Sequence, residues 1–147
     1  MILVTGGTGF VGKALIRSLV ENGRQVRTLV RPSPDSPDLP KGISVEVAVS
    51  SLNDERGLRA AMVGVDTVYH LAGVERRGAY GDLEIVDIQG TRNVISAAGD
   101  AGVNRFLTVG HLGADRSSAY PILKAKAIAE EFIRRAAIDY TIPVSYT

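Results

Sequence analysis

The sequence predicts an α/β protein built on a doubly wound parallel sheet. Short β-branched runs alternate with longer segments whose apolar residues recur at helical spacing. The length of 147 residues suits a single domain. Apolar residues make up 45% and charged residues 22%, with 17 Lys and Arg against 16 Asp and Glu. That balance is unlike a disordered chain or a basic nucleic-acid-binding protein. We therefore expect one globular domain over residues 1–147.

Six short apolar runs are predicted to be the parallel strands, and their apolar richness is typical of strands covered on both faces. They are residues 2–5, 25–31, 43–49, 67–71, 105–109 and 140–144. Four amphipathic segments between them predict helices. These are residues 10–21, 54–63, 83–101 and 118–135. Residues 32–40 hold four of the six prolines and predict a surface loop.

Several classes of function are not expected. Cysteine is absent and the histidines are His70 and His111, so neither a disulfide framework, a cysteine nucleophile nor a bound metal is predicted. No apolar stretch approaches the roughly 20 residues that cross a bilayer. No secretion signal precedes the first strand. We expect a cytoplasmic protein with no membrane span and no nucleic-acid partner.

A glycine-rich loop, TGGTGFVGK at residues 5–13, joins the first strand to the first helix. Gly7, Gly9 and Gly12 match the fingerprint in which a helix N-terminus binds the pyrophosphate of a dinucleotide. The same stretch nearly matches the phosphate loop of nucleotide triphosphatases, but Ala14 stands where a hydroxyl would bind Mg²⁺. The loop therefore predicts a dinucleotide site. The expected contacts are Gly6, Gly7, Thr8, Gly9, Phe10, Val11 and Gly12.

The end of the second strand indicates which dinucleotide binds. Proteins that bind NAD carry Asp or Glu there for the ribose hydroxyls, whereas this sequence has Arg31. An arginine can form charge-assisted hydrogen bonds to the 2′-phosphate of NADP. We therefore predict NADP as the preferred cofactor, with NAD as the alternative. A strand-end arginine in a surface ion pair would look the same in the sequence.

Together these motifs resemble the short-chain dehydrogenase/reductase superfamily, in its extended and atypical branch of NAD(P)-dependent epimerase/dehydratase-like and NmrA-like proteins. The glycine loop, GVDTVYHLAG at residues 64–73, GTRNV at residues 90–94 and Tyr120-x-x-x-Lys124 carry the resemblance. It implies a Rossmann fold with strand order 3-2-1-4-5-6. It also implies further cofactor contacts from Ser51, Leu71, Ala72, Gly73 and Lys124.

The resemblance further implies catalytic roles for Tyr120 and Lys124, which stand one helical turn apart. In the family the lysine holds the nicotinamide ribose and supports the tyrosine, which exchanges a proton with the substrate during hydride transfer. The sequence lacks the Ser or Thr that the family usually carries after the fifth strand as a third catalytic group. His111, Ser117 or Ser118 could take its place. The alternative to a catalytic role for His111 is a loop histidine whose hydrogen bonds are made locally.

Two functions remain open at this point. The first is an NADP-preferring oxidoreductase or epimerase with Tyr120 as acid/base. The second is a non-catalytic NADP-binding redox sensor or structural subunit. The missing serine and the short C-terminal end favour the second. Asp87 stands where the family has asparagine, which weakens the transfer of catalytic roles to this sequence. The sequence also ends at residue 147, where extended members continue into a substrate-binding region.

For the first function we expect a small-molecule substrate. Its determinants would lie in that further region and in residues 74–81, where Arg76 and Arg77 could attract an anionic group. The resemblance also implies a homodimer formed through the third and fourth helices. Apolar residues for such an interface, or for the core, are Ile85, Ile88, Ile128 and Phe132.

Overall fold

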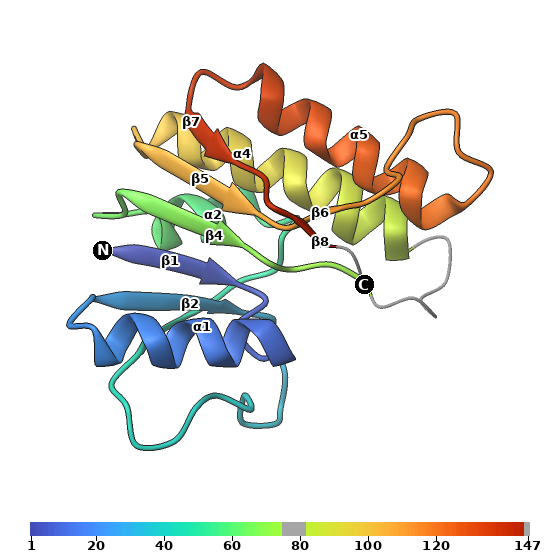
Figure 1. Cartoon of the computed structure of the whole chain (residues 1–147). Helices are drawn as coiled ribbons and strands as arrows, with labels where there is room; N and C mark the ends of the chain where they lie inside the picture. The colour runs from blue at the N-terminus through green and yellow to red at the C-terminus, as the bar shows by residue number, and fades with distance from the viewer. Residues whose placement is uncertain (75–81, 146–147) are drawn as a thin grey trace.

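The computed structural model describes residues 1–74 and 82–145 and shows a parallel sheet between helices (Figure 1). Within these residues the sheet has six strands in the order β3-β2-β1-β4-β5-β7. The predicted fold and strand order are confirmed, since β7 is the sixth strand along the chain to join this sheet. The strands are β1 (Ile2–Thr5), β2 (Val26–Val30), β3 (Glu46–Val49), β4 (Thr67–His70), β5 (Arg105–Thr108) and β7 (Asp139–Thr141).

The last predicted strand is divided in two. Residues 139–141 form β7, whereas Val144–Ser145 form β8, which pairs with β6 (Gly110–His111) in a separate two-stranded sheet. Pro143 lies between them, and because proline has no amide hydrogen it cannot continue a ladder of hydrogen bonds. Its carbonyl instead accepts from the Gly110 amide at 2.8 Å.

The predicted helices are present; the first has the predicted ends, and the ends of the others are shifted. They are α1 (Phe10–Glu21), α2 (Glu55–Ala61), the π-helix η1 (Leu83–Gly90), α4 (Thr91–Asp100) and α5 (Pro121–Arg135). The third predicted helix is therefore a π-helical segment that continues into an α-helix. The helix α5 begins three residues later than predicted, because the residue before a proline avoids helical geometry. Tyr120 is accordingly extended. None of the helices in the described ranges is long and apolar enough to cross a membrane.

Side chains of the sheet form two apolar clusters, one on each face. Leu3, Val68 and Phe106 pack with residues of α2, α4 and α5. On the other face Ile2 and Val4 pack against α1. The expectation that all strands are covered on both faces is wrong for β3 and β7, whose residues are mostly exposed. Both lie at an edge of the sheet, where neighbouring structure covers less of the strand.

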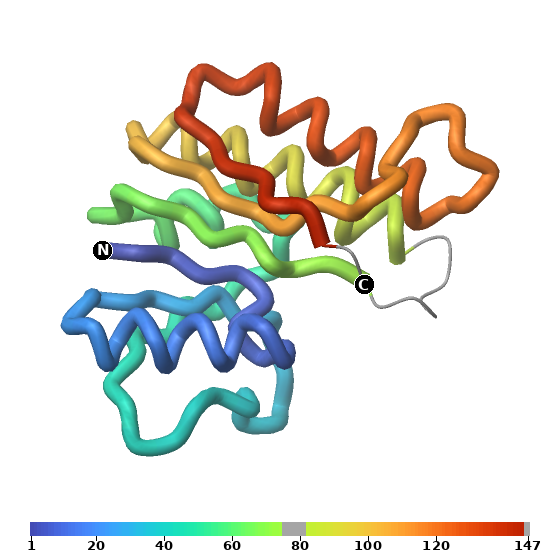
Figure 2. Tube along the Cα trace, viewed as in Figure 1, coloured from blue at the N-terminus to red at the C-terminus, as the bar shows by residue number. Residues whose placement is uncertain are grey.

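The α1 face of the sheet is covered unevenly. Helix α1 lies beside β1 and β2, in the lower half of the trace in Figure 2. A groove of about 550 Å³ lies farther along this face, lined by residues of α1, β4 and β5 that include Leu19, Tyr69 and Leu107. The groove also reaches Thr67 and Arg105, the first residues of their strands. It is therefore distant from the carboxyl edge, where the glycine loop lies.

Candidate functional site

Three glycines allow the loop after β1 to pack closely against its neighbours. Gly6 has φ of +71°, in the left-handed region that favours glycine, and a Cβ there would lie 2.6 Å from the carbonyl carbon of Leu71. A Cβ on Gly12 would overlap the Gly6 carbonyl oxygen, and one on Gly7 would overlap the Thr28 hydroxyl. The loop therefore sits against β4 on one side and β2 on the other.

This packing leaves the N-terminus of α1 open. Gly9 caps the helix without a side-chain bond, and the helical ladder starts with the Lys13 amide donating to the Gly9 carbonyl at 2.9 Å. The amides of residues 10–12 have no hydrogen-bond partner in the described part of the chain. Phe10 is 91% exposed. Free amides at the positive end of a helix dipole fit the diphosphate of a dinucleotide.

The predicted contacts beyond β2 and β3 also lie at the carboxyl edge. Arg31 follows β2 directly, is exposed, and makes no hydrogen bond or ion pair within residues 1–74 and 82–145. It is therefore available to an anion. Ser51, two residues after β3, is half-buried, and its hydroxyl accepts from the Asn53 amide at 3.2 Å. Both positions are compatible with the adenosine half of a dinucleotide.

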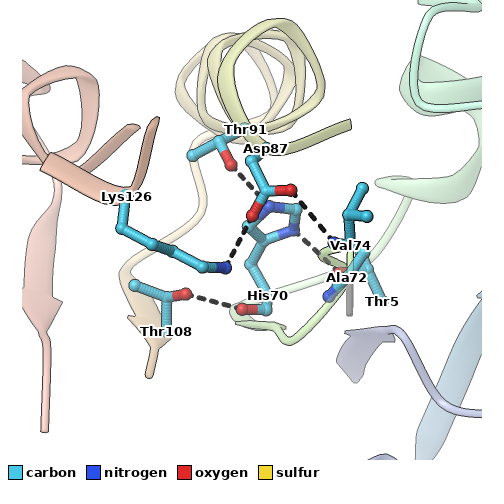
Figure 3. Close-up of polar contacts among 8 residues, drawn as sticks. All are labelled: Thr5, His70, Ala72, Val74, Asp87, Thr91, Thr108 and Lys126. Carbon is cyan, nitrogen blue, oxygen red and sulfur yellow. Dashed lines mark hydrogen bonds and ion pairs between the residues drawn. The ribbon is translucent and has the colours of Figure 1, made fainter. Parts of the chain in front are cut away.

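On the other side of the loop, His70 connects β1 to α4 (Figure 3). It ends β4 and is only 2% exposed, with Nδ1 2.8 Å from the Thr5 hydroxyl and Nε2 2.9 Å from the Thr91 hydroxyl. The Ala72 amide donates to the same Thr5 oxygen at 3.2 Å. Burial, and to a smaller extent the Lys126 charge, lowers the pKa of His70 to about 3. The imidazole is therefore neutral and holds the backbone at the end of β4.

A buried ion pair lies beside this histidine (Figure 3). Asp87, from η1, is 1% exposed, and its Oδ1 is 2.6 Å from Nζ of Lys126 on α5. Its Oδ2 accepts from the Val74 amide at 3.0 Å. A Cβ on Gly73 would lie 2.9 Å from Nζ of Lys126, so this predicted cofactor residue makes room for the ion pair. The charged groups therefore abut the backbone that follows β4.

A small cavity separates these side chains from β5. Its volume is about 20 Å³, enough for one water molecule. Thr108, the last residue of β5, lines it and donates its hydroxyl to the His70 carbonyl at 2.7 Å. Sequence reasoning did not select Thr108, although a hydroxyl at the end of a parallel strand faces the edge where ligands bind. The cavity is also lined by Ala72, Asp87, Lys126 and Glu130.

The structure does not bring Tyr120 and Lys124 into this group. Tyr120 is 71% exposed, Lys124 is exposed, and neither side chain makes a hydrogen bond or ion pair with any described residue. Lys126 reaches the site instead. The buried stripe of α5 consists of Ala125, Ala129 and Ile133. Because successive residues turn by about 100°, Lys126 borders that stripe, whereas Lys124 points away from it.

The other residues considered for the missing catalytic hydroxyl make local bonds. His111 Nδ1 is 3.0 Å from the Leu112 carbonyl oxygen. Ser117 donates to Asp115 at 2.6 Å, and the Ser118 hydroxyl accepts from the Tyr120 amide at 3.1 Å. None of these three contacts joins the network around His70. They instead shape the turn between β6 and α5.

Arg76 and Arg77, predicted to attract an anionic group, lie outside the described residues. Of the apolar residues considered for a dimer interface, Ile85 on η1 is exposed, whereas Phe132 on α5 packs against the core cluster. Ile88 and Ile128 are half-buried. A homodimer therefore stays a prediction.

A glycine loop and an open helix N-terminus, placed where the strand order reverses between β1 and β4, define a dinucleotide-binding α/β domain. The family described as NAD(P)H-binding matches residues 6–143, and the chain belongs to it, within the short-chain dehydrogenase/reductase superfamily. Its cofactor is accordingly a nicotinamide dinucleotide.

Relatives in this superfamily differ in role. The chain is 32% identical over 136 residues to the ceramide reductase of Caulobacter vibrioides, covering 92% of this chain and 42% of that protein. It is 28% identical over 141 residues to the photosystem II assembly factor Ycf39 of Cyanophora paradoxa, covering 96% and 43%. A superfamily protein from Agrobacterium tumefaciens, solved with bound NAD, superimposes with a TM-score of 0.79 at 30% identity, covering 97% and 48%. The chain thus spans less than half of each.

Proposed function

We propose that this chain binds NADP in preference to NAD and serves as a cofactor-responsive binding unit, without a Tyr120-dependent reaction. The observation that carries the proposal is the position of Tyr120, which is 71% exposed, whereas Lys126 pairs with buried Asp87 at 2.6 Å. A tyrosine acid/base must lie within hydrogen-bond reach of the reacting oxygen, and Tyr120 is exposed outside this network. The assembly factor among the relatives is compatible with a binding role.

The strand order indicates how the cofactor would lie. Its diphosphate would bind the amides of residues 10–12, and its adenosine half would extend over the ends of β2 and β3 towards Arg31 and Ser51. The nicotinamide half would then extend over β4 and β5, where Ala72 and Lys126 lie. A bound nicotinamide ring would be the group able to exchange a hydride. The chain's residues hold and orient it.

The preference for NADP rests on Arg31. Its guanidinium follows β2 and is engaged by no described residue, so the 2′-phosphate would not have to displace a partner. Replacement by aspartate would repel that phosphate. We expect Arg31→Asp to lower the affinity for NADP relative to NAD by about ten- to hundredfold.

Calorimetric titration with both oxidised dinucleotides tests this preference. Arg24→Asp is the matched control, because Arg24 is exposed just before β2 at the opposite edge of the sheet. An Arg31→Asp variant with the same ratio of the two affinities as the parent chain would exclude the 2′-phosphate contact.

A second candidate is an oxidoreductase or epimerase. It is favoured by the Thr108 hydroxyl and the Lys126 ammonium, which line one cavity beside Ala72. The reductase among the relatives is compatible with it. Oxidation of NADPH with a panel of carbonyl compounds discriminates the two functions. The binding role predicts no turnover. Turnover that is lost in Tyr120→Phe would instead establish the tyrosine mechanism.

A further inference from the structure

We propose that Asp87 sets which redox state of the cofactor the site accepts, by cancelling the charge of Lys126. The inference rests on the proposed function, because it requires a nicotinamide ring over the ends of β4 and β5. The oxidised ring carries one positive charge that the reduced ring lacks. A charged group near the ring therefore favours one redox state over the other through electrostatics alone.

The ion pair is placed to act on that ring. Asp87 and Lys126 line the same cavity as Ala72, which follows β4, and Thr108, which ends β5. The Asp87 carboxylate also accepts from the Val74 amide, so its position is fixed relative to the backbone after β4. That backbone borders the half of the crevice assigned to nicotinamide.

The two charges of the pair have opposite effects on the oxidised cofactor. Lys126 alone would repel the nicotinamide cation, and a single charge in a poorly hydrated site is weakly screened. Asp87 stands 2.6 Å from the ammonium and is almost fully buried, so the two charges nearly cancel. The site thereby admits the oxidised form, which an unopposed lysine would disfavour.

The remaining polar groups around the cavity do not change the near-cancellation of the Asp87 and Lys126 charges. Glu130 also lines it, but its carboxylate is 3.1 Å from Arg134 on the same helix. His70 is neutral, since burial lowers its pKa to about 3. Thr91 and Thr108 carry no charge. Asp87 is therefore the group whose replacement would leave Lys126 without a counter-charge.

The experiment measures dissociation constants for NADP⁺ and NADPH at pH 8 on the whole chain, by calorimetry. The informative quantity is the ratio of the two constants. Asp87→Asn keeps the shape of the side chain and removes its charge. We expect it to raise the NADP⁺ to NADPH ratio on the order of tenfold. Lys126→Met should lower the ratio by a similar factor.

Controls separate charge from shape. The double variant Asp87→Asn with Lys126→Met has no charge at either position and should return the ratio to within about threefold of the parent chain. Lys126→Arg keeps the charge and should keep the ratio. Glu84→Gln makes the same charge change as Asp87→Asn on the same helix, but Glu84 is exposed, so the ratio should not move.

The outcomes distinguish a failure of the proposed function from a failure of the role proposed for Asp87. If the parent chain binds neither form, the proposed function fails. If the chain binds both forms and Asp87→Asn leaves their ratio unchanged, the role of Asp87 is refuted while the proposed function stands. Should Asp87→Asn not fold, as judged by thermal unfolding, Lys126→Met decides: a lower ratio supports the proposal, and an unchanged ratio overturns it.

Discussion

At the scale of single residues, His70 shows how one buried side chain connects distant parts of the site. Both ring nitrogens contact threonine hydroxyls, one from β1 and one from α4. The native imidazole stays neutral because its pKa is about 3, whereas a histidine in the unfolded chain has a pKa of about 6.5. Between those values the unfolded chain takes up a proton that the native chain does not.

The free energy of unfolding should therefore fall as the pH falls through this window. From pH 7 to pH 5 we expect His70 to account for a loss of about 2 kcal/mol. Urea unfolding at the two pH values measures this loss of free energy. His111→Gln is the control, and it should show the same loss as the parent chain. Asp38, Asp66 and Asp115 have pKa values lowered from 3.8, so their effect on the free energy of unfolding falls mainly at more acidic pH than this comparison covers. Equal losses in His70→Gln and the parent chain would contradict this assignment.

Two glycines should respond in opposite ways to the same substitution. A Cβ on Gly12 would overlap the Gly6 carbonyl oxygen and lie 2.8 Å from Gly7 Cα, and these backbone atoms cannot move away cheaply. Gly12→Ala should lower the free energy of unfolding by about 1–3 kcal/mol. A Cβ on Gly99, in α4, meets its nearest atom at 4.0 Å. Gly99→Ala should raise stability by about 0.5–1 kcal/mol. Chemical denaturation measures the free energy of unfolding of both variants. If both were destabilised, the room available for the added Cβ would not explain the effect of either substitution.

The sequence indicated the close packing of the glycine loop, because a side chain on Gly6, Gly7 or Gly12 would meet neighbouring atoms. The contacts of this loop with a cofactor stay a prediction. The sequence did not indicate Lys126, because Tyr120 and Lys124 matched a spacing that two residues can match by chance. Ala125 and Ala129 could have indicated it, because they mark the buried stripe of α5. Lys126 lies beside that stripe and reaches the site.

At the scale of elements, Arg27 joins three pieces of structure. It lies on β2, donates to Glu46 on β3 at 2.7 Å, and donates to the carbonyls of Ala61 and Val63 at the end of α2, each at 2.7 Å. Its side chain is 13% exposed. A guanidinium with three such acceptors satisfies carbonyls that the helix itself leaves free.

Arg27→Met should lower the free energy of unfolding by about 1.5–3 kcal/mol. Arg27→Lys should recover part of that loss. Arg59→Met is the control: Arg59 is exposed and pairs with Glu55 at 3.9 Å, so its loss should cost less than about 1 kcal/mol. Urea denaturation measures all three. A loss no larger for Arg27→Met than for Arg59→Met would show that the junction contributes little.

Element identity was more predictable than element ends. Apolar periodicity located the helices and the central strands because each has a buried face, whereas the edge strands β3 and β7 are mostly exposed. The π-helical geometry of η1 has no local signature in the sequence, and it is the segment that carries Asp87 into the site. The later start of α5 was predictable in principle, since Pro121 restricts the residue before it.

At the scale of the whole molecule, the strand order brings the parts of the site together. The order reverses between β1 and β4, so the glycine loop, Arg31 and the Asp87–Lys126 pair all lie along one edge. Alternating strands and helices, with the family resemblance, predicted this order. They did not predict the exposure of β3 and β7, because the extent of cover on an edge strand depends on packing that the strand's own residues do not record.

Backbone amide NMR during titration with NADP tests most directly whether the first turn of α1 binds the diphosphate. We expect saturable shifts that are largest at the amides of Phe10, Val11 and Gly12, with smaller ones at Ala72. Absence of any shift at millimolar cofactor, or shifts confined to residues such as Tyr69 and Leu107 in the groove on the α1 face, would contradict it.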